Sequence, residues 1–292
     1  MKKEYLFAGT SIFFWSTVPT VTKLLMGNSI SHLQLLWAST FFAALALFCF
    51  NLFTGNIKKL KSYKLKDLCV MALIGLPGAF FYYIFYYAGA ARMPASQAFI
   101  VNYLWPVMSI VFACIILKEK LTPRKLIAIL ISFVGVAIVT CSELSSLTAD
   151  IAIGSVLCIC GAVSYGIFTA LNKKFLFDKR ISMMVNYSVS FMLTTLINGI
   201  NGDLFLPTGI QTLGIAWNGV LSIGISATCW AMALDCGKTE RISNLAYITP
   251  FLSLVWTSLI LKEPFNPFNL IGLVVIVGGI LIQFGEKKKT AA

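Results

Sequence analysis

Charged side chains are scarce in this sequence. Only 12% of its 292 residues are charged, and the 11 acidic residues are outnumbered by 23 basic ones. A soluble domain carries about 25% charged residues, so this chain cannot cover its hydrophobic residues, 58% of the total, with a water-facing shell. The composition therefore excludes an ordinary globular domain, and it excludes a disordered or collagen-like chain as well.

Ionisable groups are missing from the long apolar stretches in particular. All eleven carboxylates fall in loops or at the ends of stretches, and the single histidine, His32, falls in a loop. Because intramembrane ionisable groups mark proton relays, no such relay is expected. Paired aspartates, His-Glu-x-x-His and a Ser/Lys dyad are also missing from the stretches, which leaves an intramembrane enzyme as a remote alternative. Cys158 and Cys160 lack partner ligands and are interpreted as reduced packing residues, so neither a metal nor a cofactor is expected.

Long apolar stretches are what the sequence has in abundance. A transmembrane helix needs about 20 mostly apolar residues. Ten stretches of roughly this length occupy most of the chain, which predicts an all-α integral membrane protein with ten transmembrane helices. The ten stretches are residues 5–26, 33–53, 68–88, 95–117, 124–142, 151–172, 182–201, 211–234, 243–261 and 268–285.

Lysines and arginines are concentrated in alternate loops. Twenty of the 23 fall in the two tails and in every second loop, whereas only Lys23, Arg92 and Lys262 fall on the other side. Positively charged loops stay in the cytoplasm, so we expect a multi-pass protein of the cytoplasmic (inner) membrane with both termini inside. The net charge of +12 then reflects topology and attraction to anionic membrane lipids, and no nucleic-acid partner is expected.

The chain also contains an internal repeat. A shift of 144 positions superposes residues 103–138 on 247–282 without a gap and gives thirteen identities, including prolines, glycines and a Lys-Glu pair. This predicts a first five-helix repeat (1–142), an outer linker (143–150) and a second five-helix repeat (151–292) with a basic C-terminal tail. Because five is odd, the second repeat is inverted, and inverted repeats place the substrate site near the membrane midplane.

The repeated motif Tyr-x-x-Pro marks the expected site. It begins at Tyr103 in the fourth stretch and at Tyr247 in the ninth, so Pro106 and Pro250 occupy equivalent positions. A proline inside a helix removes one backbone hydrogen bond and kinks the axis. Matching helix kinks in the two halves indicate the central pathway, although kinks that only shape packing are an alternative.

Aromatic and amide side chains gather around these prolines. Trp and Tyr often anchor membrane interfaces, but several of these lie deep in their stretches, and an amide facing lipid would be costly. A cavity without fixed charge suits neutral or zwitterionic solutes, or cations held against aromatic faces. The candidate substrate-binding residues are Trp15, Tyr82, Tyr83, Tyr86, Asn102, Tyr103, Trp105, Tyr165, Trp230, Asn244 and Tyr247.

Glu119 and Glu263 occur at identical repeat positions. A functional role is one interpretation. The favoured one is a structural connection, because Thr122-Pro123 and Asn266-Pro267 are typical of an N-cap followed by the first-turn proline of the next helix.

Two inverted five-helix halves, each with a Pro-kinked helix, a Lys-Glu turn and a Gly-containing helix, resemble the EamA-type branch of the drug/metabolite transporter superfamily. The segments Val101–Pro106 and Trp15-Ser16-Thr17 further resemble the bacterial aromatic amino acid exporters within it. In that group, aromatic residues of the first, third, fourth and sixth helices line the cavity. The resemblance assigns that role to Trp15, Tyr103 and Trp105 directly. Tyr165 departs from the tryptophan of many relatives.

The sequence and the resemblance together predict an alternating-access exporter of small metabolites, with amino acids that are aromatic or otherwise neutral or zwitterionic as leading substrates. Efflux of cationic drugs or other metabolites is the alternative. The expected partners are a small-molecule substrate and membrane lipids. The solute, the direction and energy coupling of transport, and the choice between a monomer and a homodimer stay open.

Overall fold

The structure is a computed structural model and describes residues 3–27, 29–141, 148–236 and 245–282. Helices account for most of these residues, and no strand occurs among them. The first half of the chain contains α1 (Lys3–Gly27), α2 (His32–Phe53), η1 (Asn56–Ser62), α3 (Leu65–Leu76), η2 (Pro77–Phe81), α4 (Tyr82–Ala90), α5 (Ala95–Asn102), α6 (Trp105–Ile116) and α7 (Pro123–Cys141). The second half contains α8 (Ala149–Lys174), α9 (Lys179–Asn201), α10 (Gly209–Ala216), η4 (Trp217–Ile225), α11 (Ser226–Cys236), η5 (Ala246–Ile248), α13 (Thr249–Ile260) and α14 (Pro267–Ile282).

Several helical stretches are long and apolar enough to cross a membrane. Seven meet this description in the described residues, and two shorter apolar helices, Ala246–Ile260 and Pro267–Ile282, follow them. The chain is therefore an all-helical protein with multiple membrane spans, although seven stretches rather than the predicted ten reach the full length. The seven are His32–Phe53, Leu65–Ala90, Ala95–Ile116, Pro123–Thr140, Ala149–Lys174, Lys179–Asn201 and Gly209–Trp230.

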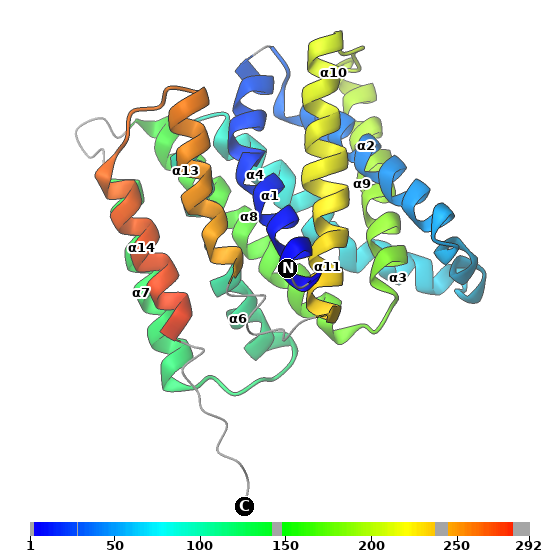
Figure 1. Cartoon of the computed structure of the whole chain (residues 1–292), viewed down its shortest axis with the longest axis horizontal. Helices are drawn as coiled ribbons and strands as arrows, with labels where there is room; N and C mark the ends of the chain where they lie inside the picture. Colours follow the sequence, from blue (N-terminus) through cyan, green and yellow to red (C-terminus); the bar gives the residue numbers. More distant parts are fainter. Residues whose placement is uncertain (1–2, 28, 142–147, 237–244, 283–292) are drawn as a thin grey trace, which may run out of the picture.

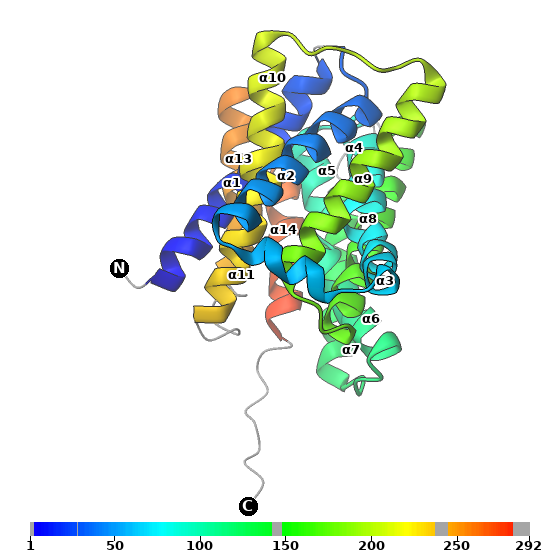
Figure 2. The same cartoon turned by 90° about the vertical axis from the view of Figure 1, so that its right-hand side faces the viewer.

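Contacts between the halves of the chain come in matching sets. Helix α6 packs on α8 as α13 packs on α1, and α4 packs on α8 as α11 packs on α1. Helix α3 packs on α9 as the π-helical segment η4 packs on α2. Two further pairs, α2 with α9 and α7 with α14, join the halves. Helices α2 and α9 lie side by side in Figure 2, and α7 and α14 lie side by side at one edge of the bundle in Figure 1.

Glycine allows the close approach of α7 and α14. A Cβ atom added to Gly135 would lie 2.7 Å from the carbonyl oxygen of Gly272, and one added to Gly279 would lie 2.7 Å from Ser132 Oγ. Contacts this short leave no room for a side chain at either position. Small residues let helices pack closely in lipid, where no hydrophobic effect drives them together.

Loops of the two halves lie at two ends of the bundle. Figure 1 shows the turn between α6 and α7 at the bottom, together with the start of α9, whereas the turn between α13 and α14 lies at the top, as do the end of α1 and the start of α10. We call the bottom end the terminal end, because α1 begins and α14 finishes towards it, and the top the opposite end. The two Lys-Glu turns of the repeat, at residues 118–119 and 262–263, therefore lie at different ends.

The first Tyr-x-x-Pro motif interrupts its helix, the second lies where α13 begins, and both prolines differ from the expected mid-helix kinks. Helix α5 ends at Asn102 and α6 begins at Trp105, so Pro106 lies in the first turn of a new helix, and Pro250 lies in the first turn of α13. A first-turn N–H has no partner within its helix, so proline loses nothing there. The helix is thus interrupted at Tyr103-Leu104, ahead of Pro106, and the 3₁₀ turn Ala246–Ile248 directly precedes α13 and Pro250.

Candidate functional site

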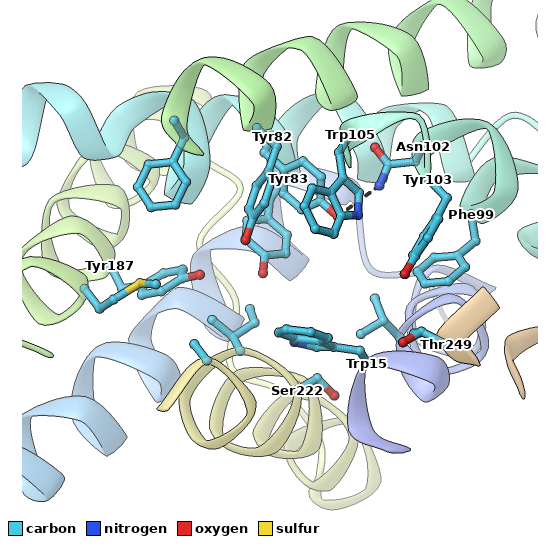
Figure 3. A pocket seen from close by; sticks show the side chains of 16 residues that line it. Trp15, Tyr82, Tyr83, Phe99, Asn102, Tyr103, Trp105, Tyr187, Ser222 and Thr249 are labelled. Atoms are coloured by element: carbon cyan, nitrogen blue, oxygen red, sulfur yellow. Dashed lines mark hydrogen bonds between the residues drawn. The ribbon is translucent and has the colours of Figure 1, made fainter. Parts of the chain in front are cut away.

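A central cavity lies at the breaks in these helices. Its enclosed volume is about 90 Å³, which is smaller than the roughly 300–1,000 Å³ of typical small-molecule sites. Both halves of the chain contribute to its wall, and Figure 3 shows the side chains converging on it. The lining residues are Trp15, Val18, Tyr82, Tyr83, Phe99, Asn102, Tyr103, Trp105, Tyr165, Phe168, Met183, Tyr187, Ser222, Ile223, Ala227 and Thr249.

Seven of the eleven residues predicted from the sequence line this cavity. They come from stretches far apart in the chain, because α1, α4, α5, α6 and α8 converge there with the α5–α6 break. The seven are Trp15, Tyr82, Tyr83, Asn102, Tyr103, Trp105 and Tyr165.

The other predicted residues lie elsewhere. Tyr86 is fully buried behind the wall, with its ring stacked on Tyr82 at a centroid distance of 6.2 Å. Trp230 lies behind Trp15, with centroids 5.1 Å apart. Tyr247 is buried in the core next to Ala246, whose carbonyl accepts a hydrogen bond from the Tyr103 hydroxyl. Asn244 lies outside the described residues.

Sequence reasoning missed several lining residues, and some of them had a usable signal. Thr249 lies inside the second Tyr-x-x-Pro motif, at the position that Trp105 occupies in the first. Phe99 is one helical turn before Tyr103, and Phe168 is three residues after Tyr165. Met183 and Tyr187 are four residues apart on α9, which is the least apolar of the seven long stretches and carries no motif.

Contacts between rings hold the aromatic part of the wall together. The Tyr82 ring contacts the Tyr83 ring at 4.8 Å and the Tyr165 ring at 4.9 Å between centroids, and Trp105 contacts Tyr165 at 5.1 Å. Asn102 Nδ2 donates a hydrogen bond of 2.9 Å to the Tyr82 hydroxyl, drawn as a dashed line in Figure 3. Each of these side chains is therefore positioned by at least one neighbour before any solute arrives.

Two π-helical segments border the cavity. The first, Pro77–Phe81, directly precedes Tyr82 and Tyr83, and the second, Trp217–Ile225, contains Ser222 and Ile223. A π-helical segment rotates the side chains that follow it, and such segments occur frequently at functional sites. In this chain one occurs at the equivalent helix of each half.

The cavity wall carries no formal charge among the described residues. Its polar atoms are phenol and alcohol hydroxyls, indole N–H groups and the Asn102 amide, and the buried Asn102 Oδ1 and Thr249 Oγ1 have no hydrogen-bond partner in the structure. Most of the wall is apolar and aromatic, with a few polar groups that can orient a ligand. This chemistry fits a flat, mostly apolar solute that is neutral or has balancing charges.

A multi-pass helical bundle with a mid-bundle cavity at broken helices is the architecture of a membrane transporter. The model of the EamA-like transporter family matches residues 2–141 and again residues 152–285. The chain belongs to this family.

Similar proteins align with most of the length of the chain. An uncharacterized transporter of Archaeoglobus fulgidus is 24% identical over 293 residues, covering 96% of this chain and 98% of its own. The aromatic amino acid exporter YddG of Ancylobacter novellus is 23% identical over 186 residues, covering 61% of this chain and 63% of its own. One solved crystal structure superposes with a TM-score of 0.68 at 20% identity over 100% of this chain and 99% of its own, which shows the shared fold alone.

Proposed function

We propose that this protein is a carrier that exports small neutral or zwitterionic metabolites across the cytoplasmic membrane, with aromatic amino acids as its leading substrates. The observation that carries the proposal is the aromatic cavity, which both halves line and which carries no formal charge in the described part of the chain. An aromatic side chain of a solute can stack between rings there, and such ring pairs contribute about 0.5–1.5 kcal/mol beyond area burial. The name of the Ancylobacter relative supports the same class of solute.

The proposal includes ten membrane spans arranged as two inverted halves with both termini in the cytoplasm. Three observations support it: the family model matches twice, contacts between helices come in matching sets, and the two Lys-Glu turns lie at different ends of the bundle (Figure 1). Two such halves can rock against each other and expose a central site to one side at a time.

The test is transport in liposomes that contain the purified full chain. The panel comprises labelled phenylalanine, tyrosine, tryptophan, alanine, glutamate and lysine, each measured with and without a pH gradient. We expect saturable flux of the aromatic amino acids, weaker flux of alanine, and none of glutamate, because the wall residues that the structure describes include no cation to compensate a net negative solute. Unsaturable flux, or flux equal to that of empty liposomes for every solute, contradicts the proposal.

Efflux of organic cations is a second candidate. Nine of the sixteen lining residues are aromatic, and ring faces attract cations by about 0.5–2 kcal/mol each. Tetraphenylphosphonium in the same liposomes separates the two candidates. Saturable flux of this cation without flux of phenylalanine selects the second.

A further inference from the structure

The Lys-Glu turn of the second half makes contacts that its counterpart in the first half does not make. The two turns share their backbone shape. Lys118 and Lys262 both have a positive φ, 55° and 56°, and the N–H of the following glutamate reaches back to the preceding helix at 3.3 Å in one turn and 3.4 Å in the other. Their carboxylates have different partners. Glu263 binds the start of a helix, whereas Glu119 binds only lysines.

Glu263 holds the start of α5. Its Oε1 accepts a hydrogen bond of 2.6 Å from the N–H of Ala95, and its Oε2 accepts one of 3.1 Å from the N–H of Ser96. An ionised carboxylate at a helix N-terminus satisfies two backbone donors that have no partner within the helix. Both hydrogen bonds are long-range, because the turn between α13 and α14 belongs to the second half of the chain and α5 belongs to the first.

The other end of the same loop is also held by a side chain. Lys23 of α1 donates hydrogen bonds to the carbonyl oxygens of Ala90 and Met93, at 3.0 and 2.8 Å. The connection between α4 and α5, residues 91–94, is therefore held by the Lys23 side chain of α1 and, where α5 begins, by the Glu263 side chain of the turn between α13 and α14.

Helix α5 separates two spaces. Ser96 and Gln97 line a pocket at the opposite end of the bundle that also contains Lys23 and Glu263. Phe99 and Asn102, one turn further on, line the central cavity. The two spaces have no lining residue in common, and all eight residues of α5 are buried. Helix α5 therefore lies between the central cavity and this pocket at the opposite end.

The equivalent carboxylate at the terminal end makes weaker contacts. Glu119 pairs with Lys173 at 2.9 Å and with Lys125 at 3.0 Å, and the side chain of Lys173 is 69% exposed. Solvent-accessible ion pairs of this kind contribute about 0–1 kcal/mol, and both of these contacts join side chains, whereas Glu263 binds the backbone at the start of a helix.

We propose that Glu263 is the latch that keeps α5 closed over the opposite end of the central cavity. The proposal rests on the alternating-access part of the proposed function and identifies the contact that must break when the cavity opens at that end. Under the proposed orientation this is the outer face of the membrane. Release of the carboxylate from Ala95 and Ser96 frees the start of α5, and Glu119 has no such role.

The test measures access to the cavity and needs no knowledge of the substrate. In a background with the eight native cysteines replaced by alanine or serine, Ala227→Cys places a reporter thiol in the cavity wall. A membrane-impermeant maleimide is added outside intact cells, and its labelling rate is compared among the reporter alone, Glu263→Gln and the matched control Glu119→Gln. Glutamine at 263 keeps one acceptor but turns an amide NH₂ towards a backbone N–H. We expect labelling to be about tenfold faster in Glu263→Gln, the shift for weakening a charge-assisted hydrogen bond, and unchanged in Glu119→Gln.

A second variant removes the donor and leaves the carboxylate intact. Ala95→Pro deletes the N–H that binds Glu263 Oε1 at the first helical position, where proline is well tolerated. Pro94 already has the extended backbone (φ −53°, ψ 141°) that a residue before proline requires. We expect the same acceleration, with normal monodisperse elution of both variants from gel filtration.

Labelling that stays at the reporter's rate in both Glu263→Gln and Ala95→Pro overturns the latch, as does equal acceleration in Glu119→Gln. Failure of the proposed function has a different signature. If Glu263→Gln accelerates labelling but no solute moves in liposomes, the latch stands and the transport assignment fails.

Discussion

The two halves of the chain contribute equal numbers of residues to the cavity but of different kinds. Eight lining residues come from each half. Six of the first eight are aromatic, whereas the second eight include only three aromatic residues together with Ser222, Ala227 and Thr249. The clearest single difference lies within the repeated Tyr-x-x-Pro motif, where Trp105 in the first half corresponds to Thr249 in the second.

This difference distinguishes two kinds of position, which we call scaffold positions, where a residue supports the fold, and recognition positions, where a residue faces the cavity. Positions that fix the backbone, such as the first-turn prolines, the positive-φ lysines and the glycines between α7 and α14, are the same in both halves or pair with each other. Positions that face the cavity have diverged. Aromatic rings predominate among the lining residues of the first half, whereas the second half adds small residues to its three rings.

The largest expected effect comes from an aromatic residue of the wall. Trp105→Ala removes the ring that contacts Tyr103 and Tyr165, and we expect it to lower the transport efficiency for phenylalanine roughly 10- to 100-fold. Trp105→Phe keeps an aromatic face and should retain most of the activity. Equal losses in the two variants would show that bulk, and not the aromatic surface, is what the site uses.

A scaffold position should respond through stability. A Cβ atom at Gly279 would lie 2.7 Å from Ser132 Oγ and 3.0 Å from the carbonyl of Ala128, whereas one at the neighbouring Gly278 meets nothing within 4 Å. Gly279→Ala should therefore destabilise the protein by about 1–3 kcal/mol and lower its Tm in detergent, while Gly278→Ala leaves the Tm unchanged. Neither variant should change the ranking of solutes, and a changed ranking would refute the separation of scaffold from recognition.

Replacement of a small lining residue should affect transport more weakly. Thr249 Oγ1 is buried and makes no hydrogen bond of standard geometry in the structure, so Thr249→Ala removes little from the protein alone. We expect an unchanged Tm and a two- to tenfold rise in the KM for a zwitterionic solute that binds this hydroxyl. Thr249→Ser keeps the hydroxyl and serves as the control, and an unaltered KM in Thr249→Ala would exclude the hydroxyl from recognition.

The smallest effect is expected at the exposed Lys-Glu turn. Hydrogen bonds from Lys173 and Lys125 lower the pKa of the Glu119 carboxyl below its usual value. Since the folded-state pKa is the lower one, the pair stabilises the protein fully above the usual pKa, and this contribution is lost as the pH falls through the lowered value. It should stay below about 1 kcal/mol because the pair is exposed.

Unfolding measured between pH 3 and 7 should therefore show a slightly shallower acid dependence for Glu119→Gln than for the parent. A steeper dependence in the variant would contradict the assigned direction of the pKa shift.

The sequence was sufficient for the features that follow from local chemistry. Apolar length placed the helices, and the Tyr-x-x-Pro motif led to the break beside Tyr103 and to seven lining residues. The motif predicted a kink at Pro106, whereas the helix is interrupted before this residue, between α5 and α6. Proline is tolerated in the first turn of α6, so it does not itself distort the helix. Tyr187 was missed because α9 carries no motif that marks it.

Contacts between distant segments could not be predicted. The carboxylate of Glu263 accepts a hydrogen bond from the N–H of Ala95, 168 residues earlier in the chain. Neither segment has a sequence pattern that predicts this contact. The favoured interpretation of both glutamates as structural connections is still compatible with the turn geometry, but only the packed bundle shows that one glutamate caps a helix and the other does not.

Counterflow in liposomes tests the central claim most directly. Vesicles containing the purified chain are loaded with unlabelled phenylalanine, diluted into a trace of labelled phenylalanine, and followed over time. A carrier with a central site accumulates label transiently above its equilibrium level, and the account predicts this overshoot in the parent, its near loss in Trp105→Ala and its retention in Trp105→Phe. Label that rises monotonically to equilibrium at the same rate in all three proteins would contradict it.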